Sequence, residues 1–120
     1  MPNQFVWVDI PVTDIDRAIA FYEAVLACSI HKEEFPGGSM GILPHAEQDA
    51  SSCLVQTADS APGQVGPLLY LNVDGRLDAA VALVEANGGS VTLRPESIGP
   101  HGFRAIILDS EGNRIAHHSS

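Results

Sequence analysis

The side chains that could carry chemistry lie far apart along this chain of 120 residues. Asp9 could act as a general base or neutralise a cationic ligand, and the hydroxyl of Tyr70 could donate a hydrogen bond to an oxyanion. His101 belongs to the residue type that titrates near neutral pH, so it could exchange a proton with a substrate. These three residues are the catalytic candidates.

A larger set of side chains could hold an organic ligand. The indole ring of Trp7 can stack on an aromatic ligand, and its N–H needs a partner if it is buried. The predicted ligand-binding residues are Trp7, Asp9, Gln56, Tyr70, His101 and His118. Structural explanations stay open, because Trp7 could fill the core, Asp9 could be a surface acid and His101 could cap a turn.

The five histidines could also bind a metal ion. Adjacent residues of a strand point to opposite faces, so His117 and His118 cannot bind one ion without a bulge. We expect His117 to face the helix side and His118 the opposite side. A divalent-metal site formed by Asp9, His101 and His118 is one alternative, and solvated histidines near the chain end are the simpler one.

Composition excludes several classes of partner. The net charge is −9 with only six basic residues, so nucleic acid and anionic membranes should be repelled. The acidic surface could serve solubility, or it could favour a cationic ligand. No segment resembles a membrane span or a signal peptide, which predicts a cytoplasmic protein with reduced Cys28 and Cys53.

The elements that must position these residues form an internal repeat. Residues 8–26 (VDIPVTDIDRAIAFYEAVL) and 69–84 (LYLNVDGRLDAAVALV) each give an alternating apolar strand, a turn and an amphipathic helix. A duplicated unit of this kind places its site between the two halves. We therefore expect the ligand in a cleft between them.

The first half begins with a strand in which Val8 and Ile10 should face the helix, while Trp7 and Asp9 face away. Asp14 is the expected N-cap of the helix that follows. Short strands are predicted at residues 30–34, 40–43 and 52–57.

In the second half, Tyr70 and Asn72 should face away from the helix, which residues 87–89 (Asn-Gly-Gly) should end. Strands are predicted at residues 90–94, 103–108 and 114–118. The predicted fold class is α+β, with two tandem βαβββ modules forming cupped mixed β-sheets and the helices on the outer face. We expect one domain: module one at 1–58, a hinge at 59–67 and module two at 68–120.

Three motifs resemble the vicinal oxygen chelate superfamily, which includes glyoxalase I, bleomycin-resistance proteins and extradiol dioxygenases. They are Asp14-x-x-Arg17-Ala18-x-x-Phe21-Tyr22-x-x-Val25-Leu26, then residues 86–89 (Ala-Asn-Gly-Gly), and residues 109–115 (Asp-Ser-Glu-Gly-Asn-Arg-Ile). They occur in the order and at the spacing typical of that family. The resemblance implies the same fold.

The resemblance also implies four inward positions where the family's enzymes bind a divalent metal through His, Glu or Gln. Carried over by position, they are Trp7, Leu54 or its neighbours, Leu68 and Ala116, and none of these is a good metal ligand. Gln56 could coordinate weakly if the strand register differed by two residues. We therefore predict no cofactor and no metal at the usual positions.

Two function classes follow. The first is a protein that binds a small organic ligand in the cleft between the modules without a metal. The second is a metal-dependent lyase, isomerase or dioxygenase of the glyoxalase I type with nonstandard ligands, so enzymatic activity stays open. An interaction module without turnover is a third reading. Because the cups leave strand edges exposed, we expect a homodimer.

Overall fold

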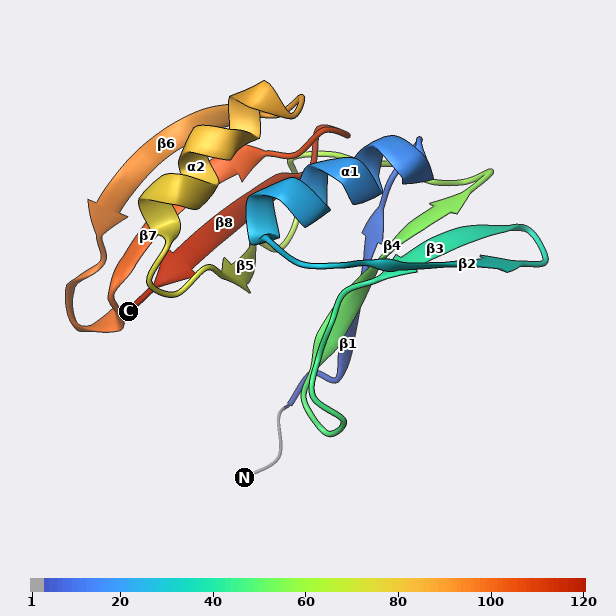
Figure 1. Cartoon of the computed structure of the whole chain (residues 1–120), viewed down its shortest axis with the longest axis horizontal. Helices are drawn as coiled ribbons and strands as arrows, with labels where there is room; N and C mark the ends of the chain where they lie inside the picture. Colours follow the sequence, from blue (N-terminus) through green and yellow to red (C-terminus); the bar gives the residue numbers. More distant parts are fainter. Residues whose placement is uncertain (1–3) are drawn as a thin grey trace.

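The computed structural model describes residues 4–120 and contains two modules with the same order of elements (Figure 1). The first module consists of β1 (Trp7–Pro11), α1 (Ile15–Leu26), β2 (His31–Phe35), β3 (Gly38–Ile42) and β4 (Ser51–Thr57). The second consists of β5 (Leu69–Asn72), α2 (Leu77–Ala86), β6 (Ser90–Ser97), the short 3₁₀ helix η1 (Gly99–His101), β7 (Phe103–Leu108) and β8 (Arg114–Ser119).

Each module folds into a four-stranded mixed sheet. The strand orders are β1-β4-β3-β2 and β5-β8-β7-β6, with β1–β4 and β5–β8 parallel and the other pairs antiparallel. The two helices lie side by side, and α2 covers the second sheet (Figure 1). This arrangement confirms the predicted fold class. No helix within residues 4–120 is long and apolar enough to cross a membrane.

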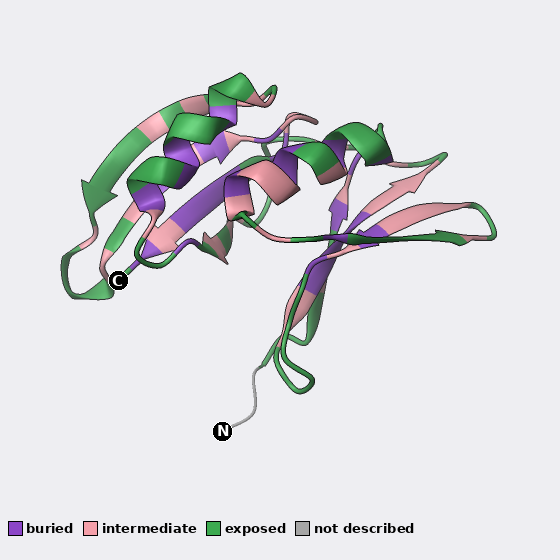
Figure 2. Ribbon diagram, in the orientation of Figure 1, coloured by how far each residue is buried: buried purple, intermediate pink, exposed green. Residues whose placement is uncertain are grey.

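The helices form where the sequence predicts them. The carboxylate of Asp14 accepts a hydrogen bond from the amide of Arg17, as an N-cap does, and α1 buries its apolar face, including Ile15, Ala18 and Tyr22. The second helix ends before Gly88, whose φ of +98° is a conformation that favours glycine. Buried positions therefore follow the helix-facing sides, whereas β2 is largely exposed (Figure 2).

Two strands differ from the expected ranges by more than one residue. Strand β3 begins at Gly38 rather than Met40, so the β2–β3 turn contains only Pro36 and Gly37. A Cβ at Gly38 would collide with the carbonyl oxygen of Gln56, which explains why glycine is required there. Strand β6 continues to Ser97. It can contain a proline because it lies at the edge of its sheet and its pairing with β7 has register shifts.

The orientation of β4 also differs from the sequence interpretation. Leu54 pairs with Ile10, is completely buried and belongs to the core on the helix side. Gln56 has the same orientation, and its side-chain oxygen accepts a hydrogen bond from the amide of Ile15 at 2.7 Å. Neither side chain shares the face of Trp7 and Asp9. The position carried over from the family is therefore wrong for Leu54, and the three consecutive apolar residues Cys53, Leu54 and Val55 give no alternation that could have shown this.

The turn between β7 and β8 fastens the second module to the start of α1. The buried carboxylate of Glu111 accepts hydrogen bonds from the amides of Thr13 and Asp14, and it forms an ion pair with Arg17 at 2.7 Å. Burial by itself would raise the pKa of Glu111, but these contacts outweigh it and lower the pKa to about 2. In the same turn, Asp109 accepts a hydrogen bond from the buried hydroxyl of Tyr22. We call residues 109–113 the clasp turn.

Candidate functional site

The face of the first sheet that points away from α1 carries a chain of three polar groups. Trp7 donates its indole N–H to the sulfur of Cys53, and the thiol of Cys53 donates to the carboxylate of Asp9, both at 3.3 Å. Trp7 is 40% exposed and also meets the edge of the His45 ring. The indole N–H thus finds its partner within the sheet, and the ring lines a surface rather than filling the core.

The surroundings of Cys53 disfavour the thiolate form of its side chain. Burial is the main cause that raises the pKa of Cys53 to about 11, and the neighbouring carboxylate of Asp9 adds to the effect. A thiol with that pKa is almost fully protonated at neutral pH, so it is a poor nucleophile and a poor metal ligand. Both cysteines are unpaired, as predicted.

The corresponding face of the second sheet is hollowed. An open cavity of about 610 Å³ is lined by Tyr70, Leu71, Asn72, Ile98, His101, Arg104 and His118. We call this cavity the second-sheet hollow. It brings together three of the predicted site residues, which come from β5, η1 and β8.

Arg104 is the functional candidate that sequence reasoning missed. It follows Phe103 on β7, and its neighbour Ala105 is buried on the helix side, so Arg104 lies on the opposite face. Its guanidinium donates to the hydroxyl of Tyr70 and forms an ion pair with Glu96 at 3.3 Å. The hydrogen bond to Tyr70 and the contact with Glu96 raise the pKa of Arg104 above its ordinary value, so it stays cationic. The alternation of buried Ala105 and Ile107 was the signal that could have found it.

The hydrogen bond of His118 defines its tautomer. Its Nε2 lies 2.6 Å from the backbone carbonyl oxygen of His101, and because a carbonyl can only accept, Nε2 must carry the proton. In a neutral ring Nδ1 is then an acceptor. The ring also meets Tyr70 edge-on at a centroid distance of 6.4 Å. His117 is completely buried on the helix side, as predicted.

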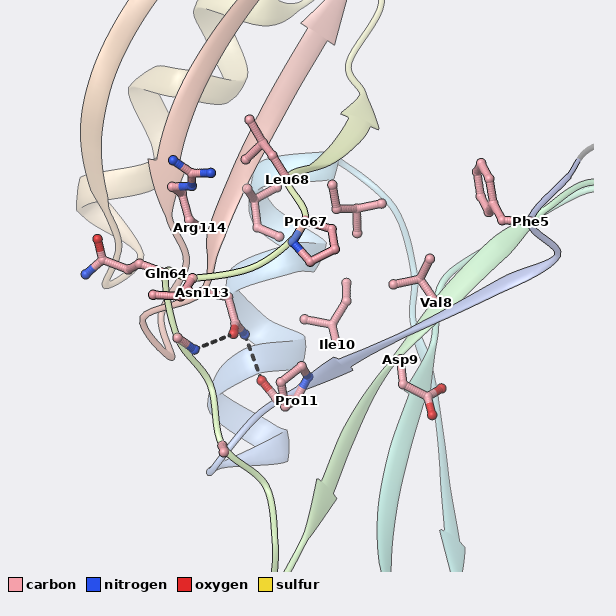
Figure 3. Close-up of a pocket in the computed structure, with 15 residues that line it drawn as sticks. Phe5, Val8, Asp9, Ile10, Pro11, Gln64, Pro67, Leu68, Asn113 and Arg114 are labelled. Carbon is pink, nitrogen blue, oxygen red and sulfur yellow. Dashed lines mark hydrogen bonds between the residues drawn. The ribbon is translucent and has the colours of Figure 1, made fainter.

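A second cavity, of about 600 Å³, lies between the modules. Figure 3 shows Val8 and Ile10 pointing from β1 toward Pro67 and Leu68, while Asp9 points to the other side. Leu69 and Ile115 complete an apolar wall, with Arg114 at the edge. This cavity occupies the expected place of the cleft, but only Asp9 of the predicted ligand-binding residues lines it.

The structure therefore divides the predicted site. Tyr70, His101 and His118 share the second-sheet hollow, and Trp7 and Asp9 share the first-sheet face. Gln56 belongs to neither, because it caps α1. Within residues 4–120, no three His, Cys, Asp or Glu side chains lie close enough to hold a metal ion.

The four positions that the resemblance assigns to metal ligands also occupy different surroundings. Trp7 is half exposed, Leu54 and Ala116 are buried, and Leu68 lines the cavity between the modules. No side chain at these positions offers an oxygen or an imidazole nitrogen. The donor chemistry of the described residues does not fit the family's usual metal at these positions.

Residues 4–116 match the family model described as Glyoxalase/Bleomycin resistance protein/Dioxygenase superfamily. The chain is 29% identical over 113 residues to a Mycobacterium bovis protein named "Putative glyoxylase CFP32", across 91% of this chain and 42% of that protein. It thus spans less than half the length of this relative. It is 28% identical to a glyoxylase-like domain-containing protein of Didymella fabae, across 95% of this chain and 91% of the relative.

Solved structures share the fold at low sequence identity. A glyoxalase/bleomycin resistance protein from Albidiferax ferrireducens T118 superimposes with a TM-score of 0.75 at 20% identity, covering 98% of this chain and 99% of that one. A glyoxalase I mutant from Zea mays gives 0.70 at 18% identity, covering 95% of this chain and 46% of the maize chain. The arrangement of two mixed sheets and two helices is common to all of them.

Proposed function

The chain belongs to the glyoxalase/bleomycin resistance protein/dioxygenase superfamily, and from this premise we propose that it binds a small organic ligand without the family's usual metal. The observation that carries the proposal is the convergence of Tyr70, His101, Arg104 and His118 on the second-sheet hollow. The hollow has the volume of a small-molecule site, with apolar side chains and a few convergent polar groups.

A screen of small organic compounds tests this proposal. Binding is followed by thermal shift and by the backbone amide resonances of the ¹⁵N-labelled protein, and metal content is measured by mass spectrometry on protein purified without chelators. We expect ligand-induced shifts at β5, β8 and residues 98–104, and far less than one metal ion per chain. A screen without shifts in these segments would contradict ligand binding in the hollow.

One observation favours a second candidate function, a metal-dependent lyase, isomerase or dioxygenase with nonstandard ligands. His101 and His118 line the same hollow, and imidazole is a common ligand of catalytic metals. Asp9, the third member of the alternative site, lies on the other module. A near-stoichiometric amount of zinc, nickel, iron or manganese in the purified protein would favour this enzyme over metal-free binding.

We also propose a homodimer. The edge strands β1 and β5 face the cavity between the modules, and Phe5 and Val6 beside it are 59% and 74% exposed. A second copy could cover these edges and apolar side chains. Sedimentation velocity at micromolar concentration should give a species of twice the chain mass, and a species near 12.7 kDa would contradict the dimer.

We retain the cytoplasm as the proposed location, since Cys28 and Cys53 are unpaired. Fractionation of cells that express the full-length protein at its natural level would test this.

A further inference from the structure

The polar groups of the second-sheet hollow are mostly hydrogen-bond donors. A guanidinium has five N–H groups, and in the described part of the chain Arg104 uses one on Tyr70 and one on Glu96. The hydroxyl of Tyr70 accepts from Arg104 and has its own proton left to donate. The amide oxygen of Asn72 is occupied by the amide of Asp74, which leaves its NH₂ group to donate.

The hollow offers few acceptors and no carboxylate. Glu96 does not line the hollow, and it accepts its hydrogen bond from Nε of Arg104, so the terminal nitrogens of the guanidinium keep N–H groups that can donate to a ligand. The side-chain acceptors are two imidazole nitrogens: Nδ1 of His118, whose Nε2 donates to the carbonyl of His101, and one ring nitrogen of a neutral His101. A complementary ligand must therefore bring more acceptors than donors.

From this excess of donors we infer that the second-sheet hollow selects a small organic carboxylate that carries a hydroxyl group near the carboxylate. The carboxylate accepts hydrogen bonds from Arg104 and Tyr70, and the hydroxyl donates to Nδ1 of His118. Ile98 provides apolar contact for the carbon skeleton. The inference rests on the proposed function, and it is opposite to the preference for cations that the net charge of −9 would suggest.

Local geometry can oppose the net charge of the molecule, because exposed charges further apart than about 8–10 Å are largely screened at physiological salt. A charge-assisted hydrogen bond at close range is not screened in this way. Arg104 is also held in place before a ligand arrives, since Glu96 and Tyr70 fix its planar group from two sides. This preorganisation lowers the entropic cost of binding.

Mandelate and mandelamide form a matched pair of probes for this inference. Both carry a phenyl ring and a hydroxyl, but only mandelate has the carboxylate. Binding is measured by titrating each compound into the ¹⁵N-labelled full chain. We expect mandelate to shift resonances of β5, β8 and residues 98–104, and mandelamide to bind about tenfold more weakly, because a charged hydrogen bond is lost.

Variants identify the group responsible. Arg104→Gln should weaken mandelate about tenfold, and Tyr70→Phe, which keeps the ring, should weaken it by a smaller factor. Arg114→Gln is the matched control, because Arg114 lies at the cavity between the modules. The spectrum of each unliganded variant reports whether it is folded, and Tyr70→Phe provides the test if Arg104→Gln does not fold.

Four outcomes would overturn the inference. Equal affinity for mandelate and mandelamide, or unchanged mandelate affinity in both Arg104→Gln and Tyr70→Phe, would show that the carboxylate is not selected, while ligand binding itself would stand. Shifts confined to other segments, with weakening by Arg114→Gln, would place the site elsewhere. Absence of any shift at millimolar mandelate would exclude this ligand class, and the compound screen described above decides ligand binding separately.

Discussion

The two modules share one order of elements but present different chemistry on their helix-free faces. The first sheet shows an indole, a protonated thiol and a carboxylate at Trp7, Cys53 and Asp9. The second shows a guanidinium, a phenol and an imidazole at Arg104, Tyr70 and His118. The helix-facing residues must keep the pattern of the repeat because they form the core, whereas the opposite face can diverge. Function should therefore be sought where the modules differ.

The helices also differ in how their first turns are stabilised. Helix α1 is capped by Asp14, by Gln56 from its own sheet and by Glu111 from the clasp turn of the other module. Helix α2 begins after Arg76 without a side-chain cap. The first module therefore depends on the second through buried charged groups, and this asymmetry leads to the predictions below.

Removal of the clasp carboxylate should have the largest effect. Glu111→Ala leaves two backbone amides and Arg17 without their acceptor, and we expect it to lower the free energy of unfolding by about 3–4 kcal/mol. Glu111→Gln keeps an acceptor oxygen and should cost less. Urea denaturation monitored by circular dichroism measures both.

The control for this prediction is Glu47→Ala, which removes an exposed glutamate from the loop before β4. We expect that variant to match the wild type within about 0.5 kcal/mol. A loss of similar size in Glu47→Ala and Glu111→Ala would show that the clasp does not hold the modules together.

Acid should destabilise the protein in two separate pH windows, one for His117 and one for Glu111. Burial holds the folded-state pKa of His117 at about 4, below the ordinary value of 6.5. The unfolded chain thus binds the extra proton first, and stability falls as the pH drops from about 6.5 to about 4. For Glu111, the stabilisation present above its ordinary pKa of 4.5 is lost as the pH falls toward 2.

The variant His117→Leu separates the two windows. Neither ring nitrogen of His117 has a hydrogen-bond partner within the described residues, so an apolar side chain of similar volume should be tolerated. We expect the wild type to lose about 2–3 kcal/mol between pH 6.5 and 4, and the variant to lose less over that range. Identical pH profiles for the two proteins would contradict the role of His117.

Trp7→Ala tests whether Trp7 lies on an exposed face of the first sheet or fills a close-packed core. The side chain is 40% exposed, so we expect a loss of only about 1–2 kcal/mol, compared with about 3–5 kcal/mol for a Trp in a close-packed core. Thermal denaturation measures the change. If Trp7 also stacks on a ligand, the mutation should weaken binding by roughly 1–3 kcal/mol, and quenching of its fluorescence in the wild type should report that ligand.

The smallest predicted effect concerns the thiol on that face. Asp9→Asn removes the carboxylate that helps to raise the pKa of Cys53, so the rate of alkylation by iodoacetamide should increase severalfold. The measurement is made at constant pH in a Cys28→Ala background, with Asp49→Asn as the control. A rate unchanged by Asp9→Asn would mean that burial alone protects the thiol.

The apolar pattern of the sequence predicted some elements of this fold better than others. The helices, and the faces on which the side chains of β1 lie, agree with the prediction from the sequence. Strict apolar periodicity leaves only one way to bury each of these elements. The side-chain orientation of β4 differs from the prediction, because three consecutive apolar residues give no alternation. Gln56 was therefore placed on the wrong face. Arg104 was overlooked because the alternation of Ala105 and Ile107 indicates only which face it lies on, while its partners Tyr70 and Glu96 come from other strands.

The sequence alone determined the repeat, the α+β class and the family, because these depend on local periodicity and on motifs within short stretches of chain. Only the tertiary structure decided how the candidate residues are grouped. Trp7 and Asp9 lie on one sheet and Tyr70, His101 and His118 on the other, and which faces meet depends on the packing of α1 against α2 and on the clasp turn. Those contacts join residues far apart in the sequence, such as Arg17 and Glu111, which are 94 positions apart. The sequence by itself contains no local pattern from which such distant contacts can be inferred.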